Sequence, residues 1–262
     1  ASADFYDGLE NLKGVDINTN SLTFKAINSR GFGTFANTRF VQLVDGMDNS
    51  APVLNFPLGN LLGMTETDVK NIELIPGTNS ALYGANAMNG ILLMNSKSPF
   101  DHQGVSGQLK RGITSQDAAG DNEYKDLQLR WGHKFSDKLA AKVNYAYLEG
   151  TDWIANNYDD RFRRGISRDH YGYDGVNIYG DEVATNLRGA AQAAFAAGAL
   201  PADVSNLTPS VTVSRTGYRE IDLTDYEAES KKADWGLYYR PFGDDLEFSY
   251  VGKWGTGQTV YQ

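Results

Sequence analysis

The sequence of 262 residues contains no cysteine, only three histidines and no long apolar run. Without cysteine the chain can form no disulfide framework, no thiolate metal site and no cysteine nucleophile. The histidines, His102, His133 and His170, lie far apart and lack the H-E-x-x-H spacing of a zinc site. No stretch reaches the 18 or more apolar residues that a transmembrane helix needs.

Positive charge is also scarce, with 24 Lys and Arg against 33 Asp and Glu, which gives a net charge of −9. Nucleic-acid binding needs clustered lysine and arginine, so this balance argues against a nucleic-acid partner. The sequence also lacks a nucleophile elbow, a phosphate-binding loop and a dinucleotide fingerprint. We therefore expect no enzymatic activity, no catalytic residue and no cofactor.

One acidic cluster could in principle bind a metal ion, and it lies between residues 150 and 229. Carboxylates that could donate oxygens to Ca²⁺ are Asp159, Asp160, Asp169, Asp174, Asp181 and Glu182. The twelve-residue spacing of an EF-hand is absent, and nearby arginines can neutralise the cluster: Arg161, Arg163, Arg164 and Arg168. We interpret the cluster as solvated charge and predict no metal site.

The most informative features that are present are two motifs near the N-terminus. The first, from Thr38 to Gly46, reads TRFVQLVDG and ends in an Asp-Gly turn. The second, from Asn71 to Lys97, reads NIELIPGTNSALYGANAMNGILLMNSK. The pair resembles the plug domain of TonB-dependent outer-membrane transporters. Positions that agree with the second family motif are Ile72, Glu73, Ile75, Gly77, Ser80, Ala81, Leu82, Tyr83, Gly84, Ala87, Gly90, Ile91 and Lys97.

Residues 1–100 are therefore expected to form a small α/β plug domain. A helix from Phe5 to Leu12 is predicted, capped by the preceding polar residues. Short strands are predicted at 15–17, 22–28, 39–44, 71–75 and 91–95. Without the resemblance, the alternative is a small soluble domain whose glycines form ordinary turns.

From residue 101 onward, five segments alternate apolar and polar side chains. They lie at 105–113, 125–133, 139–147, 233–239 and 246–254. A period of two places one set of side chains on each face of a sheet. In a transporter barrel the apolar set meets lipid and the polar set faces the plug. We expect these residues to face outward: Leu127, Leu129, Trp131, Val143, Tyr145, Trp235, Leu237 and Phe248.

Connection lengths orient the predicted sheet. Tight turns are predicted at Phe135–Asp137 and Pro241–Asp245, and longer links at Thr114–Tyr124 and Gly150–Glu229. Short turns on one side and long loops on the other are typical of outer-membrane barrels. Plugged transporters have 22 strands. Residues 101–262 are therefore expected to be the first five strands of an incomplete antiparallel barrel, in the N-terminal portion of a longer receptor. A soluble β-sandwich shows similar alternation in each single strand.

The resemblance implies a receptor in the outer membrane of a Gram-negative bacterium, surrounded by lipid. Such a receptor binds a ligand outside the cell and imports it when TonB, driven by an inner-membrane motor, rearranges the plug. By position, the loops at the plug apex are Met47–Asn60 and Asn79–Asn89. Ligand-binding candidates there are Asp48, Asn49, Leu54, Asn55, Phe56, Tyr83, Asn86 and Asn89. Arg30, at the family's R-G position, is expected to contact acidic residues of the barrel, while Pro76 replaces a second family arginine.

Several alternatives stay open at this point. The ligand could be a siderophore, cobalamin, a peptide or an oligosaccharide. The plug resembles those of Bacteroidota receptors, some of which work with a surface lipoprotein. Rival classes are a receptor that only signals and a soluble β-rich binding or adhesion module. The link Gly150–Glu229, with a predicted helix at Glu182–Ala199, is expected to be ordered, to lie outside the cell and to contribute to ligand capture.

Overall fold

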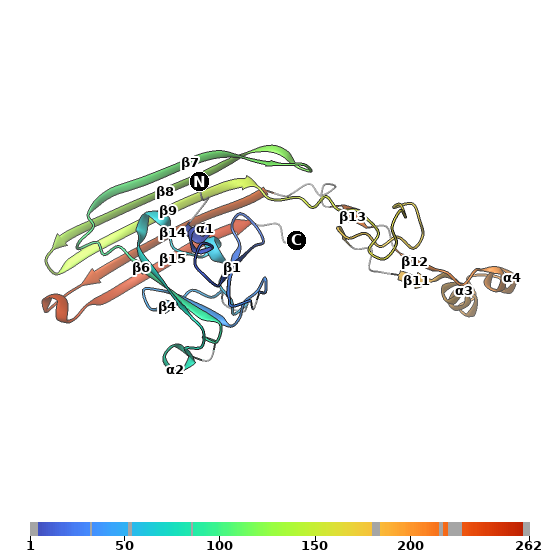
Figure 1. The fold of residues 1–262 in the computed structure, drawn as a ribbon, viewed down its shortest axis with the longest axis horizontal. Helices are drawn as coiled ribbons and strands as arrows, with labels where there is room; N and C mark the ends of the chain where they lie inside the picture. Colours follow the sequence, from blue (N-terminus) through green and yellow to red (C-terminus); the bar gives the residue numbers. More distant parts are fainter. Residues whose placement is uncertain are drawn as a thin grey trace. The chain divides into compact units, whose positions relative to one another are not determined.

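The computed structural model describes residues 5–31, 33–51, 54–84, 86–179, 184–214, 217–219 and 227–258. Packing divides the chain into two compact units (Figure 1). The first comprises Ala1–Thr114, Asp121–Asp152 and Tyr226–Gln262, and the second comprises Ser115–Gly120 and Trp153–Asp225. Among the residues that the structure describes, no helix is long and apolar enough to cross a membrane.

The first unit begins with a small α/β domain, called the N-terminal domain here (residues 5–97). Helix α1 (Phe5–Leu9) precedes a hairpin of β1 (Val15–Thr19) and β2 (Lys25–Ser29). A four-stranded sheet then has the order β4-β3-β6-β5, and β3 and β6 are parallel. Its strands are β3 (Phe40–Val44), β4 (Met47–Asp48), β5 (Val69–Pro76) and β6 (Gly90–Ser96). Short helical turns are η1 (Gly59–Leu61), η2 (Glu66–Asp68) and α2 (Ser80–Tyr83).

Two of the predicted boundaries in this domain are wrong. Helix α1 stops at Leu9 because a turn, closed by the Leu12 N–H on the Leu9 carbonyl, replaces the expected last helical turn. Strand β2 starts at Lys25 and not at residue 22, because Ser21 and Phe24 hydrogen-bond each other's backbone in a tight turn. The motif-bearing strands β3, β5 and β6 lie where the sequence predicts them.

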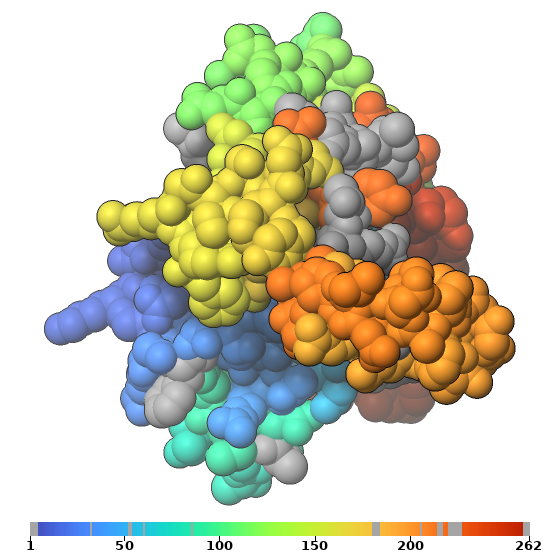
Figure 2. Space-filling model, turned by 90° about the vertical axis from the view of Figure 1, so that its right-hand side faces the viewer, coloured from blue at the N-terminus to red at the C-terminus, as the bar shows by residue number. Residues whose placement is uncertain are grey.

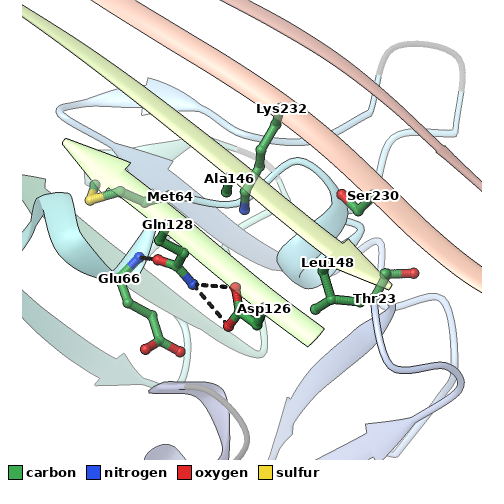
Figure 3. A pocket seen from close by; sticks show the side chains of 9 residues that line it. All are labelled: Thr23, Met64, Glu66, Asp126, Gln128, Ala146, Leu148, Ser230 and Lys232. Atoms are coloured by element: carbon green, nitrogen blue, oxygen red, sulfur yellow. Dashed lines mark hydrogen bonds between the residues drawn. The ribbon is translucent and has the colours of Figure 1, made fainter. Parts of the chain in front are cut away.

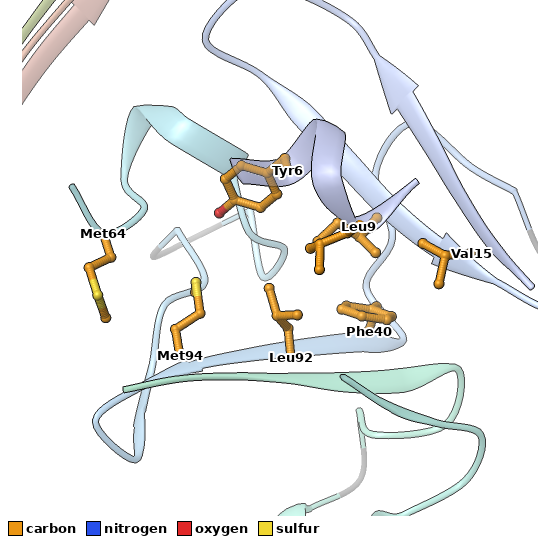
Figure 4. Close-up of a cluster of buried hydrophobic side chains, with 8 residues drawn as sticks. Tyr6, Leu9, Val15, Phe40, Met64, Leu92 and Met94 are labelled. Atoms are coloured by element: carbon orange, nitrogen blue, oxygen red, sulfur yellow. The ribbon is translucent and has the colours of Figure 1, made fainter. Parts of the chain in front are cut away.

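A hydrophobic core joins α1 to the inner face of the mixed sheet (Figure 4). Its buried members are Tyr6, Leu9, Val15, Ile27, Phe40, Met64, Leu92 and Met94. Full burial of a large apolar side chain contributes roughly 1.5–3 kcal/mol. The Tyr6 hydroxyl donates a hydrogen bond of 3.3 Å to Gln42 Oε1, so the polar end of the ring is satisfied within the core.

The rest of the first unit is a five-stranded antiparallel sheet, called the wall here. Its strands are β7 (Gly104–Gln116), β8 (Gly120–Ser136), β9 (Leu139–Thr151), β14 (Glu227–Tyr239) and β15 (Phe248–Gln258), in the order β15-β14-β9-β8-β7. All five predicted strands are present. The predicted link Thr114–Tyr124 is wrong, because β7 and β8 continue through most of it and leave a turn at residues 117–119.

Burial on the wall alternates in the predicted sense. On β8, Arg130 is 2% exposed whereas its neighbour Leu129 is 43% exposed. The expected outward residues are exposed on every strand tested, except Leu127, which is partly buried. The inner face instead carries buried polar side chains, among them Asp126, Gln128, Arg130, Lys142, Asn144 and Ser230. The wall is therefore apolar outside and polar inside.

The second unit contains short strand pairs and two helices. Strand β10 (Ile178–Tyr179) pairs with β13 (Tyr218–Arg219), and β11 (Ala184–Asn186) pairs with β12 (Thr212–Ser214). Helices α3 (Leu187–Ala196) and α4 (Ala202–Leu207) form the orange lobe in Figure 2. Within the predicted helix Glu182–Ala199, α3 starts at Leu187 because the Asn186 side chain accepts from the Gly189 N–H and caps it. Helix α4 was not expected.

Candidate functional site at the contact between the N-terminal domain and the wall

The contact between the N-terminal domain and the wall centres on Asp68, the last residue of η2. Its carboxylate is almost fully buried and accepts from Arg130 Nε at 2.7 Å, Lys142 Nζ at 2.7 Å and Asn144 Nδ2 at 3.0 Å. These donors come from β8 and β9, at alternate inner-face positions. Two cations and an amide thus converge on one carboxylate of the N-terminal domain.

Strand register explains why these groups meet. Pairing aligns Arg130, Asn144, Asp234 and Lys253 in one row across β8, β9, β14 and β15. Asn144 Nδ2 also donates to Asp234 Oδ1 at 2.6 Å, which links the two carboxylates. A buried charge without a partner is costly, so removal of the Asp68 carboxylate would leave Arg130 and Lys142 uncompensated. The row therefore specifies where η2 docks on the wall.

Arg130 also holds the segment that joins the N-terminal domain to the wall. Its Nη1 donates to the His102 carbonyl at 2.9 Å and its Nη2 donates to the Lys97 carbonyl at 3.1 Å. A Cβ at Gly132 would come within 2.7 Å of that His102 oxygen. Glycine at 132 thus lets the joining segment approach the wall closely.

A second group of contacts surrounds Glu66. Its backbone N–H donates to Gln128 Oε1 at 2.8 Å, and its carboxylate lies 2.8 Å from Lys110 Nζ. Beside it is a small cavity of about 20 Å³, lined by Thr23, Met64, Glu66, Asp126, Gln128, Ala146, Leu148, Ser230 and Lys232 (Figure 3). This volume is large enough for one water molecule.

Contacts extend along the full length of the wall strands. At the end that carries the long connection, Asp152 accepts from Ser21 Oγ at 2.6 Å and from the Leu22 N–H at 2.7 Å. At the end with the tight turns, the Arg240 guanidinium lies 4.1 Å from the Phe100 ring centroid. A hydrogen bond of 2.6 Å from Arg240 to Glu247 raises the pKa of that guanidinium.

A larger cavity of about 460 Å³ lies beside β14 and β15. Its polar lining includes Asn49, Asp234 and Lys253. Lys253 Nζ donates to Asn49 Oδ1 at 3.1 Å and to the Leu62 carbonyl at 3.0 Å. Asn49 is 7% exposed, and its Nδ2 has no hydrogen-bond partner among the residues that the structure describes. Most of the remaining lining is apolar and includes Met47, Leu62 and Trp235.

The predicted ligand-binding residues fall into two groups. Asp48, Leu54, Asn55, Tyr83 and Asn86 are exposed, and Phe56 is partly buried. Asn49 and Asn89 are buried, and both take part in hydrogen bonds within the first unit. Their role in ligand binding stays a prediction.

The structure does bring the two predicted apex loops together. Asn86 Nδ2 lies 3.5 Å from Asn55 Oδ1, which joins the loop after α2 to the loop before η1. The Phe56 ring stacks on Phe24 with centroids 6.0 Å apart. The turn between β1 and β2 therefore lies next to the predicted apex. Pro52 and Val53 of the first loop lie outside the described residues.

Arg30 has an exposed side chain and a backbone φ of 58°. Its guanidinium packs over Gly77, where a Cβ would come within 2.9 Å of Nη1. Within the part of the chain that the structure describes, Arg30 forms no salt bridge. The proposed contact between Arg30 and the barrel stays a prediction.

The acidic cluster of the second unit is organised by backbone hydrogen bonds. Asp160 accepts from the N–H groups of Phe162, Arg163 and Asp174. Burial by itself raises the pKa of the Asp160 carboxyl, but these hydrogen bonds outweigh it and the net pKa is lowered. No group of three or more His, Asp or Glu in the described ranges is placed to hold a metal ion. Asp181 and Glu182 lie outside those ranges.

Sequence reasoning missed Asp68, the residue on which the contact centres. It precedes β5 in a short helical turn and carries no motif of its own. The sequence did contain a signal for the partners of Asp68. Arg130, Lys142 and Asn144 occupy polar positions in strands that alternate apolar and polar residues. Alternation predicts that such side chains face inward, but it does not say which carboxylate they meet.

Comparison with known proteins agrees with this architecture. Residues 1–91 match the family described as TonB-dependent Receptor Plug Domain. No match was found among curated proteins. The ferric enterobactin receptor PfeA is similar over 98% of this chain and 31% of its own, with a TM-score of 0.51 and 19% identity. A mutant of that receptor from Pseudomonas aeruginosa gives a TM-score of 0.50 at 19% identity, over 97% of this chain and 30% of its own.

The siderophore receptor PirA from Acinetobacter baumannii is similar over 98% of this chain and 30% of its own, with a TM-score of 0.52 and 13% identity. The chain thus spans about a third of the length of the solved receptors it matches. Its fold is that of a plug domain followed by antiparallel barrel strands, as the sequence predicts. The N-terminal domain is called the plug from here on.

Proposed function

We propose that the protein is a TonB-dependent outer-membrane receptor that binds a ligand outside the cell and takes it up. The observation that carries this proposal is the polarity of the two faces of the wall. The exposed outer face carries apolar side chains, and the inner face, which contacts a domain of the plug family, carries buried polar side chains. An apolar outer face is stable against lipid but unfavourable in water. A polar inner face suits a lumen that the plug occupies.

The character of the plug–wall contact fits a plug that has to move. It is built from hydrogen bonds and ion pairs, beside a cavity of about 20 Å³. When such polar contacts separate, water replaces each lost hydrogen bond. The net cost is therefore only about 0.5–1.5 kcal/mol for a neutral hydrogen bond and about 1.5–3 kcal/mol for a hydrogen bond to a charged group. A dry apolar interface of equal area would resist separation at roughly 25 cal/mol per Å².

TonB would supply the force for this movement, as the plug resemblance implies. Ligand capture is assigned to the exposed residues of the apex loops, Asn55, Tyr83 and Asn86 among them, and to the connection Gly150–Glu229. That connection is also the surface for a lipoprotein partner of the kind found with Bacteroidota receptors. Deletion of residues 154–222 should leave assembly intact and abolish ligand or partner binding.

Uptake measurements in cells test the activity. The full-length protein is expressed in cells that lack their own receptors, with and without TonB. Labelled ferric siderophores, cobalamin, peptides and oligosaccharides are then supplied one at a time. We expect one of these classes to accumulate only when the receptor and TonB are both present. Equal accumulation without TonB for every class would contradict the proposal.

A tether between plug and wall tests the mechanism. The given sequence has no cysteine, and Ser21 and Asp152 touch across the contact, so Ser21→Cys with Asp152→Cys introduces one close pair of thiols. Joining the thiols should stop uptake while surface binding of the ligand persists, and reduction should restore uptake. Each single variant, treated in the same way, is the control. Full uptake through a completely tethered protein would refute plug movement at this contact.

A further inference from the structure

The cavity of about 460 Å³ beside β14 and β15 has the size of a small-molecule site, for which roughly 300–1,000 Å³ is usual. Its lining comes from the turn between β3 and β4 on the plug and from Tyr238, Val251 and Lys253 on the wall. The exposed apex residues that we assign to ligand capture are not among its described lining residues. The cavity is therefore built from other residues than the predicted apex site.

The lining contains a hydrogen-bond donor without an acceptor. Asn49 Oδ1 accepts from Lys253 Nζ at 3.1 Å. Because an ammonium group can only donate, Asn49 has to present its oxygen to Lys253, and its Nδ2 lies on the other side of the amide. Within the described ranges this Nδ2 has no partner, although Asn49 is nine-tenths buried.

Gln42 repeats this pattern on the neighbouring strand. The Asn49 N–H donates to the Gln42 carbonyl at 2.9 Å, so the two residues are opposite each other across the hairpin of β3 and β4. Gln42 is fully buried, and its Nε2 also lacks a partner in the part of the chain that the structure describes. Burial of an unsatisfied donor is unfavourable. Two such amides on one hairpin favour a further molecule with acceptor oxygens.

The charged groups of the lining leave a place for one cation. They are Asp45, Asp48, Asp68, Asp234, Lys142 and Lys253. Arg130, which binds Asp68, adds a third cation to the two lysines. Four carboxylates against three cations leave an excess of one negative charge.

The two carboxylates beside the turn of β3 and β4 carry this excess. Asp45 accepts from the Ser96 N–H at 2.8 Å and from Ser96 Oγ at 2.6 Å, and Asp48 accepts from the Ser50 N–H at 2.8 Å. All three donors are neutral. Neither carboxylate forms a salt bridge with another described residue, so a cation placed here meets no competing salt bridge.

The remaining space has apolar walls. Apolar lining residues are Val44, Met47, Leu62, Met64 and Val251. A fitting molecule therefore combines one ammonium group, an acceptor oxygen and an apolar body. The N-terminal end of an apolar peptide has all three. A multiply charged anion would instead meet charge of its own sign, and a neutral oligosaccharide would leave the excess charge unmatched.

We propose that this cavity binds the N-terminal end of a short apolar peptide between plug and wall. The ammonium group meets Asp45 and Asp48, and a peptide carbonyl accepts from Asn49 Nδ2. The apolar side chains contact Met47 and Leu62. This inference rests on the proposed function, because it treats the peptide as the molecule that is taken up.

Calorimetric titration of the full-length protein in detergent tests the site. The probes are trileucine, N-acetyl-trileucine, maltotriose and citrate. We expect saturable binding of trileucine, weaker by about fivefold when acetylation removes its charge, which is the effect of one ion pair at a partly exposed site. Maltotriose and citrate should not bind the cavity.

Two variants locate the binding. Asp48→Asn keeps an oxygen for the Ser50 N–H but removes a charge, so it should weaken trileucine about fivefold and leave N-acetyl-trileucine unchanged. Asn49→Ala removes the free donor and should weaken both peptides about fivefold. The matched control is Asp16→Asn, the same substitution at an exposed plug position outside the lining, which should change neither. Thermal unfolding of each variant checks that the fold is intact.

The proposal is overturned if trileucine does not bind saturably, or if acetylation leaves its affinity unchanged. Equal losses in Asp16→Asn and Asp48→Asn, or tighter binding of citrate than of trileucine, would overturn it as well.

Uptake of the same peptide separates this site from the proposed function. Binding that responds to the variants as expected, without TonB-dependent uptake, would leave the site standing and refute import. TonB-dependent uptake of another class of ligand, without binding of trileucine, would refute the site and leave import standing.

Discussion

The strands of the plug and the strands of the wall bury opposite kinds of side chain. On β6 of the plug, the buried side chains are apolar, with Ile91 and Leu92 fully buried. On β8 of the wall, Arg130 is buried and Leu129 is exposed. Period-two alternation therefore identifies two faces of a strand but does not say which of them is the inside. The surroundings decide that.

This difference has an energetic consequence. The plug is stabilised by burial of apolar surface in its own core. The inner face of the wall gains nothing of that kind, since burial of polar groups is favourable only when each finds a partner. Asp68, Glu66 and Asp152 all meet partners across the plug–wall contact. The wall therefore depends on the plug for the satisfaction of its buried cations.

The largest expected effect comes from Asp68→Asn. The substitution keeps the size of the side chain but leaves Arg130 and Lys142 buried without a carboxylate. Removal of one partner from a buried ion pair costs about 3–5 kcal/mol. The free energy of plug unfolding, followed by urea titration with limited proteolysis, should fall by that amount.

Glu66→Gln is the control for this prediction. Its contact with Lys110 is partly exposed, so its loss should cost no more than about 1 kcal/mol. A similarly small loss of unfolding free energy for Asp68→Asn would mean that water hydrates Arg130 and Lys142. The wall would then not depend on the plug to satisfy its buried cations.

A pair of leucine substitutions compares the two regions directly. Leu92→Ala empties a fully buried position in the plug core and should cost about 2–5 kcal/mol. Leu129→Ala removes the same atoms from the exposed face of the wall and should cost less than about 1 kcal/mol in detergent. Thermal unfolding of both variants measures the difference. If Leu129→Ala is as costly as Leu92→Ala, the outer face of the wall packs against protein.

The smallest expected effect is local and concerns pH in the second unit. The pKa of Asp160 is lowered in the folded state, so its contribution to stability is present above the unfolded pKa and is lost as pH falls through the folded pKa. Protection from hydrogen exchange around residues 160–175, corrected for intrinsic rates, should therefore decrease from pH 6 toward about pH 3. Asp160→Asn should remove this dependence. Unchanged protection in the unaltered protein would contradict it.

Local pattern was sufficient to locate the wall strands and less reliable at their ends. Alternation predicted all five, because most inner residues and their outer neighbours differ in polarity. The pattern predicted a loop from Thr114 to Tyr124, because Ser115, Gln116 and Gly120 are residues common in loops. In the structure these three residues belong to β7 and β8. Strand pairing extends beyond the apolar band there, since backbone hydrogen bonds do not require apolar side chains.

The sequence predicted the positions of the candidate ligand-binding residues but not which of them are exposed. Motif position predicts Asn55 and Asn86 for the plug apex, and the structure shows that both are exposed and that Asn86 Nδ2 lies 3.5 Å from Asn55 Oδ1. Asn49 and Asn89 carry the same side chain but are buried in internal contacts. An asparagine in a loop can serve either purpose, and sequence spacing does not distinguish them.

The sequence by itself determined the architecture, because the plug motifs and the period-two pattern are local properties of the chain. It also determined that the wall has one apolar and one polar face. Only the tertiary structure decided that Asp68 meets Arg130, Lys142 and Asn144. These contacts join residues far apart in the sequence. Their register depends on pairing between strands and on docking of the plug, neither of which any single segment encodes.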